Sequence, residues 1–119
     1  MSGLIRVSEE ADWVAANWIF DHVKRMLLPA LQEKDPSGEL AQCIAEDDQS
    51  GMSFIVLTDL PSEHMMLLHA AVEEVRSRLA SEGPEAIADP SFFSALMERV
   101  AALADMIGTD ARLQQARGG

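Results

Sequence analysis

The sequence predicts a mostly α-helical fold, a single domain over residues 1–119 with about four helices and a small two-stranded β patch. Three observations lead to this prediction. The chain has 119 residues, of which 48% are hydrophobic, enough to build one core. Only 5% are aromatic, so the core must consist mainly of aliphatic residues and Met, and Ala, Leu and Met favour helices. Long segments also repeat apolar residues at the helical spacing of three and four.

The N-terminal residues are predicted to form a short strand followed by a long helix. The segment LIRV, residues 4–7, alternates loosely and can form a strand. Ser8 can cap a helix, because acidic residues follow in the first turn, where the helix dipole favours them. This helix would kink or end near Leu28, since Pro29 cannot donate a backbone hydrogen bond. Its buried face would hold Trp13, Ala16, Phe20, Val23, Leu27 and Leu31.

A second helix and a second strand are predicted in the middle of the chain. Asp35 and Pro36 are typical of a helix start, and this helix would run to about residue 45. Cys43 follows the apolar pattern of this helix, so we expect it to be a small buried residue. Residues 53–57 form strand-favouring sequence, and because a lone strand is unstable we expect them to pair with residues 4–7.

Two further helices are predicted in the C-terminal half. Residues 59–82 form the clearest helical pattern, which the Gly-Pro at 83–84 ends. Its core stripe consists of Leu68, Val72, Val75 and Leu79. The Asp-Pro at 89–90 opens a last helix that ends at Gly108. Its apolar face consists of Phe92, Leu96, Val100, Leu103 and Ile107. Residues 109–119 have little to bury and are expected to form a frayed tail.

The charge of the chain points to a particular kind of partner. Twenty acidic residues against nine basic ones give a net charge of −11. Such a surface disfavours nucleic acid and anionic membranes, which bind Lys and Arg patches, and suits a basic protein partner. Eight acidic residues and one base lie within residues 33–63. With no apolar run long enough for a membrane span and no secretory leader, we expect a cytoplasmic protein.

The stretch CIAEDDQSG, residues 43–51, resembles neither a metal loop nor a redox site. Its acids follow the first positions of a calcium loop, but Leu57 occupies the position where a bidentate Glu belongs. Cys43 is the only cysteine, so no disulfide can form within the chain, and the neighbouring carboxylates disfavour a reactive thiolate. We therefore expect these acids to be either a solvated helix end or a docking surface.

No arrangement of residues predicts catalysis, a cofactor or a metal. His64 and His69 are five residues apart, which on a helix separates them by about 140° and prevents them from sharing a metal ion. The sequence holds no nucleophile elbow, Walker-type loop or dinucleotide fingerprint. We therefore predict that the protein is not an enzyme and has no cofactor.

Trp18 and Met66 are the apolar residues most suited to a partner contact. Trp18 points away from the predicted core face of its helix, and a large aromatic on a polar face suggests a binding hot spot or a dimer contact. Met66 is expected to point outward, where its flexible side chain can adapt to a partner. The alternative for Trp18 is that another element of the fold covers it.

These observations favour a small cytosolic interaction domain. Our leading hypothesis is an immunity or antitoxin protein that neutralises a basic toxin, such as a nuclease, through segment 33–63. The partner-binding residues would be Glu46, Asp47, Asp48, Asp59, Glu63, Trp18 and Met66. The alternative is a homodimeric adaptor or a secretion-type chaperone that holds a client segment against exposed Met, Leu and Trp side chains.

Overall fold

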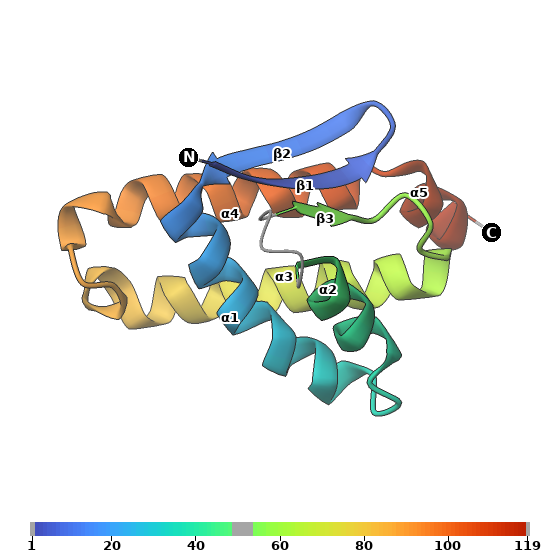
Figure 1. Ribbon diagram of the computed structural model, residues 1–119, viewed down its shortest axis with the longest axis horizontal. Coiled ribbons are helices and arrows are strands. Elements are labelled where there is room, and N and C mark those ends of the chain that lie inside the picture. Colours follow the sequence, from blue (N-terminus) through green and yellow to red (C-terminus); the bar gives the residue numbers. More distant parts are fainter. Residues whose placement is uncertain (1, 49–53, 119) are drawn as a thin grey trace.

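Three strands form a small sheet along one side of the molecule (Figure 1). The computed structural model describes residues 2–48 and 54–118; of residues 46–48 and 116–118 it describes the backbone alone. Strand β1 (Ser2–Ser8) lies between β2 (Ala11–Ala16) and β3 (Phe54–Val56). β1 pairs antiparallel with β2 and parallel with β3, where Leu4 faces Phe54. The predicted pairing of residues 4–7 with residues 53–57 is therefore confirmed for the described residues.

The strand β2 replaces the beginning of the helix that the sequence predicted after Ser8. Residues 11–16 alternate between the two faces of the sheet, with Trp13 and Ala15 buried and Asp12 and Val14 exposed. The spacing of Trp13 and Phe20 also matched a helix, and this coincidence produced the wrong prediction. The indole Nε1 of Trp13 donates a hydrogen bond to the carbonyl oxygen of Arg99 (2.8 Å), which ties the hairpin to the last long helix.

Five helices supply the rest of the described fold. They are α1 (Asn17–Lys34), α2 (Glu39–Asp48), α3 (Ser62–Glu82), α4 (Phe93–Gly108) and α5 (Ala111–Gly118). Two 3-10 turns, Gly83–Ala86 and Pro90–Phe92, connect α3 to α4. α3 and α4 lie side by side, while α1 crosses α3 and places α2 next to β3 (Figure 1). The structure confirms the predicted mostly helical fold with a small β patch.

The predicted boundaries of α1 and α2 need correction. α1 does not end near Leu28, since it continues through the exposed Pro29 to Lys34. α2 begins at Glu39, after Gly38 adopts a positive φ of 76°. Asp35 still acts at this helix start, because its carboxylate accepts a hydrogen bond from the backbone N–H of Leu40 (3.1 Å).

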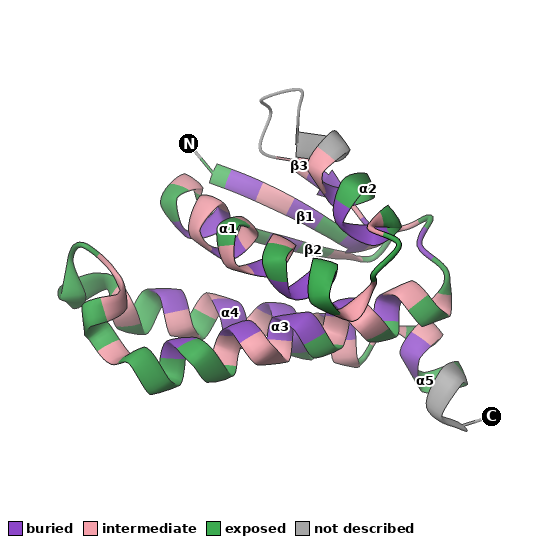
Figure 2. Cartoon of the chain, turned by 90° about the horizontal axis from the view of Figure 1, so that it is seen from below, coloured by how far each residue is buried: buried purple, intermediate pink, exposed green. Residues whose placement is uncertain are grey.

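The helices bury the stripes that their spacing predicted (Figure 2). The buried residues of α3 include Leu68, Val72, Val75 and Leu79. Those of α4 include Leu96, Val100, Leu103 and Ile107. Three burial predictions were wrong: Ala16, at the end of β2, is exposed, Cys43 is exposed, and Phe92 is 53% exposed. Phe92 belongs to a 3-10 turn, whose tighter winding turns it away from the core, and Phe93 packs there instead.

The C-terminal segment is anchored, although the sequence predicted fraying from residue 109. Leu113 is fully buried in the core. Arg112 Nη1 donates hydrogen bonds to the carbonyl oxygens of Leu57 (2.7 Å) and Leu60 (2.8 Å), and its Nη2 donates to that of Val7 (2.7 Å). One side chain thus connects the beginning of α5 to β1 and to the chain between β3 and α3.

Candidate functional site

Trp18 is exposed, as its helical position predicted, and it lies against a second exposed aromatic residue. The Trp18 side chain is 39% exposed and that of Phe92 is 53% exposed. Their ring centroids are 6.0 Å apart with an angle of 53° between the planes. Trp18 is in the first turn of α1 and Phe92 in the turn before α4. The fold therefore brings two residues that are far apart in the sequence together as an aromatic pair at the surface.

A groove of about 360 Å³ adjoins this pair and will be called the aromatic groove. One side is α1, and the other is the connection between α3 and α4. Its lining residues are Trp18, Asp21, His22, Arg25, Ala86, Ile87 and Ala88. The α1 residues recur at intervals of three and four and so share one helix face. The groove combines apolar surface with charges of both signs.

A second groove, of about 660 Å³, lies at the tip of the β1–β2 hairpin and will be called the hairpin groove. Its acidic lining residues are Glu9, Glu10 and Asp110, and Thr58 and Met106 also contribute. Its lining base is Arg112, whose guanidinium is already bonded to backbone carbonyls and to Asp110. The hairpin groove is therefore acidic in net charge.

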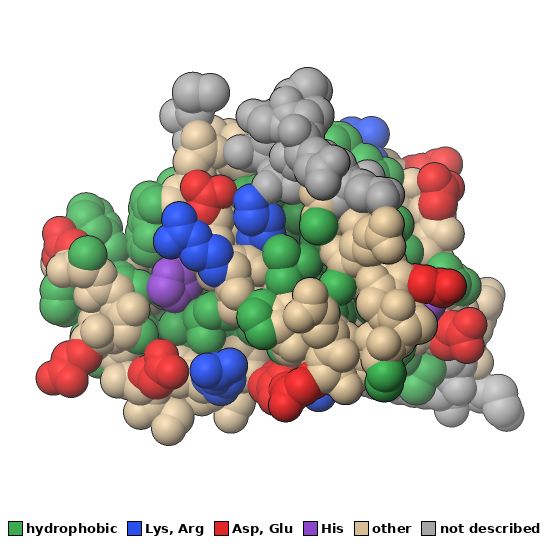
Figure 3. Space-filling model, turned by 60° about the horizontal axis from the view of Figure 1, so that its bottom comes forward, with side chains coloured by type: hydrophobic (Ala, Val, Ile, Leu, Met, Phe, Trp, Pro, Cys, Tyr) green, Lys and Arg blue, Asp and Glu red, His purple; other side chains and the backbone are tan. Residues whose placement is uncertain are grey.

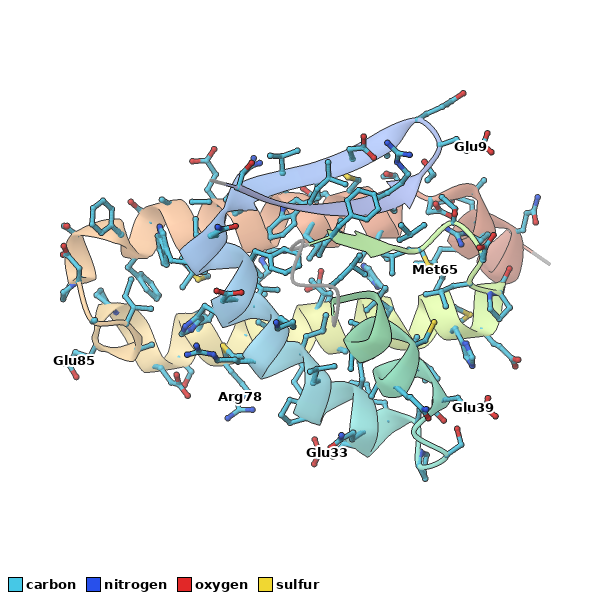
Figure 4. The ribbon with its side chains drawn as sticks, in the orientation of Figure 1. Glu9, Glu33, Glu39, Met65, Arg78 and Glu85 are labelled. Carbon is cyan, nitrogen blue, oxygen red and sulfur yellow. The ribbon has the colours of Figure 1, made fainter. Side chains whose placement is uncertain are left out.

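The two grooves lie at opposite ends of the molecule. Figure 4 shows Glu9, at the hairpin tip, on the far side of the molecule from Glu85, which lies in the turn beside the aromatic groove. On the face shown in Figure 3, acidic side chains alternate with hydrophobic and basic ones. The net charge of −11 is thus not gathered into one acidic surface on that face.

The predicted partner-binding acids occupy two places in the fold. Glu46, Asp47 and Asp48 belong to the last turn of α2, and their side chains lie outside the described residues. Asp59 is exposed in the turn before α3, where it directly follows Thr58 of the hairpin groove, and Glu63 is exposed in the first turn of α3.

The fold separates the two predicted apolar contacts, Trp18 and Met66. Met66 is 45% exposed and lies one helical turn after Glu63. Trp18 lies beside the residues that follow the other end of α3. The helical rise along α3 separates Met66 from Glu82 by about 24 Å. Trp18 and Met66 therefore cannot form one compact hot spot, and whether either of them binds a partner stays a prediction.

Three aspartates are held in the ionised state by local hydrogen bonds. The Ser91 hydroxyl and backbone N–H lower the pKa of Asp89 below its ordinary value. The Ser37 hydroxyl and the Leu40 backbone N–H do the same for the pKa of Asp35. Hydrogen bonds from Arg112 lower the pKa of Asp110, and burial opposes them. These interactions explain helix caps and anchoring, and they do not form an acid–base pair.

Sequence reasoning missed Phe92 and Arg112. Phe92 fitted the apolar spacing of the last helix, and the preceding Asp-Pro-Ser was the available signal that it belongs to a capping turn. Arg112 gave no such signal, because its partners are carbonyl oxygens far away in the sequence.

The described residues hold no group of three or more His, Cys, Asp or Glu side chains that could bind a metal ion. Nor does any helix among them have the length and apolar character needed to cross a membrane.

Comparison with known proteins identifies a shared fold. No protein-family model matches the sequence, and no curated protein matches it. The chain is similar to a chain in the solved structure of the CdiA-CT toxin from Burkholderia pseudomallei E479 in complex with its cognate CdiI immunity protein. The TM-score is 0.70 at 21% sequence identity, and the match covers 93% of this chain and 98% of that one.

Proposed function

We propose that this protein is an immunity-type protein that binds a toxin and neutralises it. The observation that carries the proposal is the similarity to one chain of a toxin–immunity complex over nearly the whole length of both chains. A TM-score of 0.70 over this coverage supports a shared fold rather than a local resemblance.

The charge of the chain favours the immunity role over the toxin role. A toxin that attacks nucleic acid needs a surface that attracts phosphate, and this chain carries a net charge of −11. A protein that covers such a toxin needs the opposite charge, because carboxylates can occupy a groove built for phosphates. Long-range attraction would also speed the capture of the toxin.

The hairpin groove and the acids beside it are the surface that we assign to this contact. Glu9, Glu10, Asp59 and Glu63 are all exposed, and the adjoining groove offers about 660 Å³ to an inserted side chain or loop. Met66, one turn beyond Glu63, adds an adaptable apolar contact. Asp47 and Asp48 belong to the same acidic segment of the sequence and would form a second contact, at the end of α2.

The test is to capture partners from the source cell at low and at high salt and then express the captured protein alone. We expect one basic protein, enriched at low salt, whose expression stops cell growth. Co-expression of this chain should restore growth. A captured protein whose toxicity or activity is unchanged by this chain would refute the proposal.

Charge reversal tests the acidic segment separately. Asp47→Lys combined with Asp48→Lys should weaken toxin binding at low salt, because both substitutions replace attraction with repulsion. The matched control is Glu98→Lys combined with Glu82→Lys, which changes the net charge by the same amount on α4 and α3. Equal effects of the two pairs would show that only total charge matters.

The homodimeric adaptor or chaperone remains the second candidate because of the outer face of the sheet. Leu4, Val14 and Phe54 lie on the face opposite the buried Ile5 and Trp13, and Val14 is 45% exposed. Sedimentation of the purified protein distinguishes the two candidates. A dimer that persists in high salt would favour the adaptor, and a monomer would favour the immunity role.

A further inference from the structure

The aromatic groove has a chemistry different from that of the hairpin groove. Trp18 and Phe92 are large rings that remain exposed although they touch each other. Exposed rings retain electron-rich faces that attract cations, and Trp attracts them most strongly. At a centroid distance of 6.0 Å and a tilt of 53° the two rings contact each other directly, and their exposed outer surfaces stay open to a group placed above them.

Charges around the pair are arranged to favour a cation at its Trp18 end. Asp21 is one helical turn beyond Trp18 on the same face of α1. Within the described part of the chain, no ion pair uses Asp21. Asp89, three residues before Phe92, is kept ionised by its bonds to Ser91. Arg25 is the base that lines this groove. It lies one helical turn beyond Asp21 and two turns beyond Trp18, so Trp18 is the α1 lining residue farthest from it.

We propose that the notch formed by Trp18, Phe92 and Asp21 binds an arginine side chain of the partner toxin. A guanidinium group can stack on an aromatic ring and at the same time donate hydrogen bonds to a carboxylate, which an ammonium group does less well. The apolar part of the arginine would pack on Ile87 and Ala86 along the groove.

The source of the arginine rests on the proposed function, whereas the chemistry of the notch can be tested alone. The probe is the capped peptide acetyl-Gly-Arg-Gly-amide, titrated into ¹⁵N-labelled protein at low salt. The indole N–H signal of Trp18 reports binding, and Trp18→Phe assigns it. The indole of Trp13 is an internal reference, since it is fully buried and bonded to the Arg99 carbonyl oxygen.

We expect the Trp18 signal to shift and saturate while the Trp13 signal stays in place. Phe92→Ala and Asp21→Asn should each weaken the binding of the peptide about two- to fivefold, as expected for exposed cation–π and ionic contacts. Val14→Ala is the matched control, because it removes an exposed apolar side chain outside the groove and should leave binding unchanged.

A peptide with norleucine in place of arginine separates a cation site from a merely apolar one. Equal shifts with both peptides, or no saturable shift at Trp18, would overturn the inference. A Trp18 signal that changes with protein concentration alone would also overturn it, since a second copy would then occupy the notch. None of these results affects the growth-rescue test of the proposed function, so the two can fail independently.

Discussion

Arg112 shows how a single side chain can hold distant segments together. Its guanidinium contacts the carbonyl oxygens of Val7, Leu57 and Leu60, and it is paired with Asp110 at 2.8 Å. The side chains of Arg112 and Asp110 are 21% and 6% exposed. Loss of the guanidinium would remove this donor from the carbonyl oxygens of Val7 and Leu60, while that of Leu57 keeps the backbone N–H of Leu60 (3.1 Å). It would also leave the largely buried Asp110 carboxylate without its ion pair, and such losses are costly in partly buried places.

Arg112→Ala should lower the free energy of unfolding by about 2–4 kcal/mol. Arg112→Lys should recover only part of this loss, because an ammonium group cannot reach the same acceptors as the planar fork. Urea denaturation measures both. The control is Arg6→Ala, which breaks an exposed pair with Asp12 (2.9 Å) and should change stability much less than Arg112→Ala does. Comparable losses in the two Ala variants would contradict the assigned role.

The pairing of Asp110 also predicts how stability depends on acid pH. Because Arg112 lowers the pKa of Asp110 in the folded state, the ionised carboxylate stabilises that state. This contribution is present above the unfolded pKa of about 3.9 and is lost as the pH falls through the lower folded value. As the pH falls below about 4, the free energy of unfolding of the Asp110→Asn variant should therefore decrease less than that of the native chain. Parallel pH profiles from urea unfolding would refute this expectation.

Secondary structure was predictable wherever one pattern fitted alone. α3 and α4 contain unambiguous stripes, and the residues of both stripes from Leu68 to Ile107 are buried apart from Phe92. The segment 11–16 fitted two patterns, because Trp13 can belong both to an alternating strand and to a helical face. The pairing of β2 with β1 selects the strand. That pairing depends on the turn after Ser8, and the sequence was also compatible with Ser8 as the cap of a helix.

The contact between β1 and α1 predicts that Gly3 cannot carry a side chain. A Cβ atom at this position would overlap the ring of Phe20 on α1. Gly3→Ala should therefore destabilise the protein by about 1–3 kcal/mol, as overpacking does elsewhere. Phe20→Ala should be less harmful in the Gly3→Ala background than in the native chain, because it removes the ring carbons that the added methyl group would overlap. Additive losses in thermal unfolding would argue against this overlap.

The features that indicate a partner are the net charge and the surface grooves of the whole molecule, and no single motif in the sequence indicates one. The net charge and the exposure of Trp18 could be predicted from residue types and spacing. The grooves could not, because each joins segments that lie far apart in the chain, such as the hairpin tip with α5 or α1 with the turn before α4. The sequence therefore indicated the kind of partner and left the shape of the surface undetermined.

The acidic hairpin groove and the aromatic groove lie at opposite ends of the molecule. This separation predicts two distinct effects on the kinetics of binding to a basic toxin. Asp59→Lys combined with Glu63→Lys should lower the association rate about tenfold at low salt, and the difference should shrink as salt screens the charges. Trp18→Ala should instead raise the dissociation rate at every salt concentration, because a short-range packing contact is lost. Stopped-flow fluorescence or surface binding kinetics can resolve the two rates. If both variants changed the same rate with the same salt dependence, one surface would have to serve both roles. The length of α3 between Glu63 and Glu82, whose end lies near Trp18, argues against a single surface.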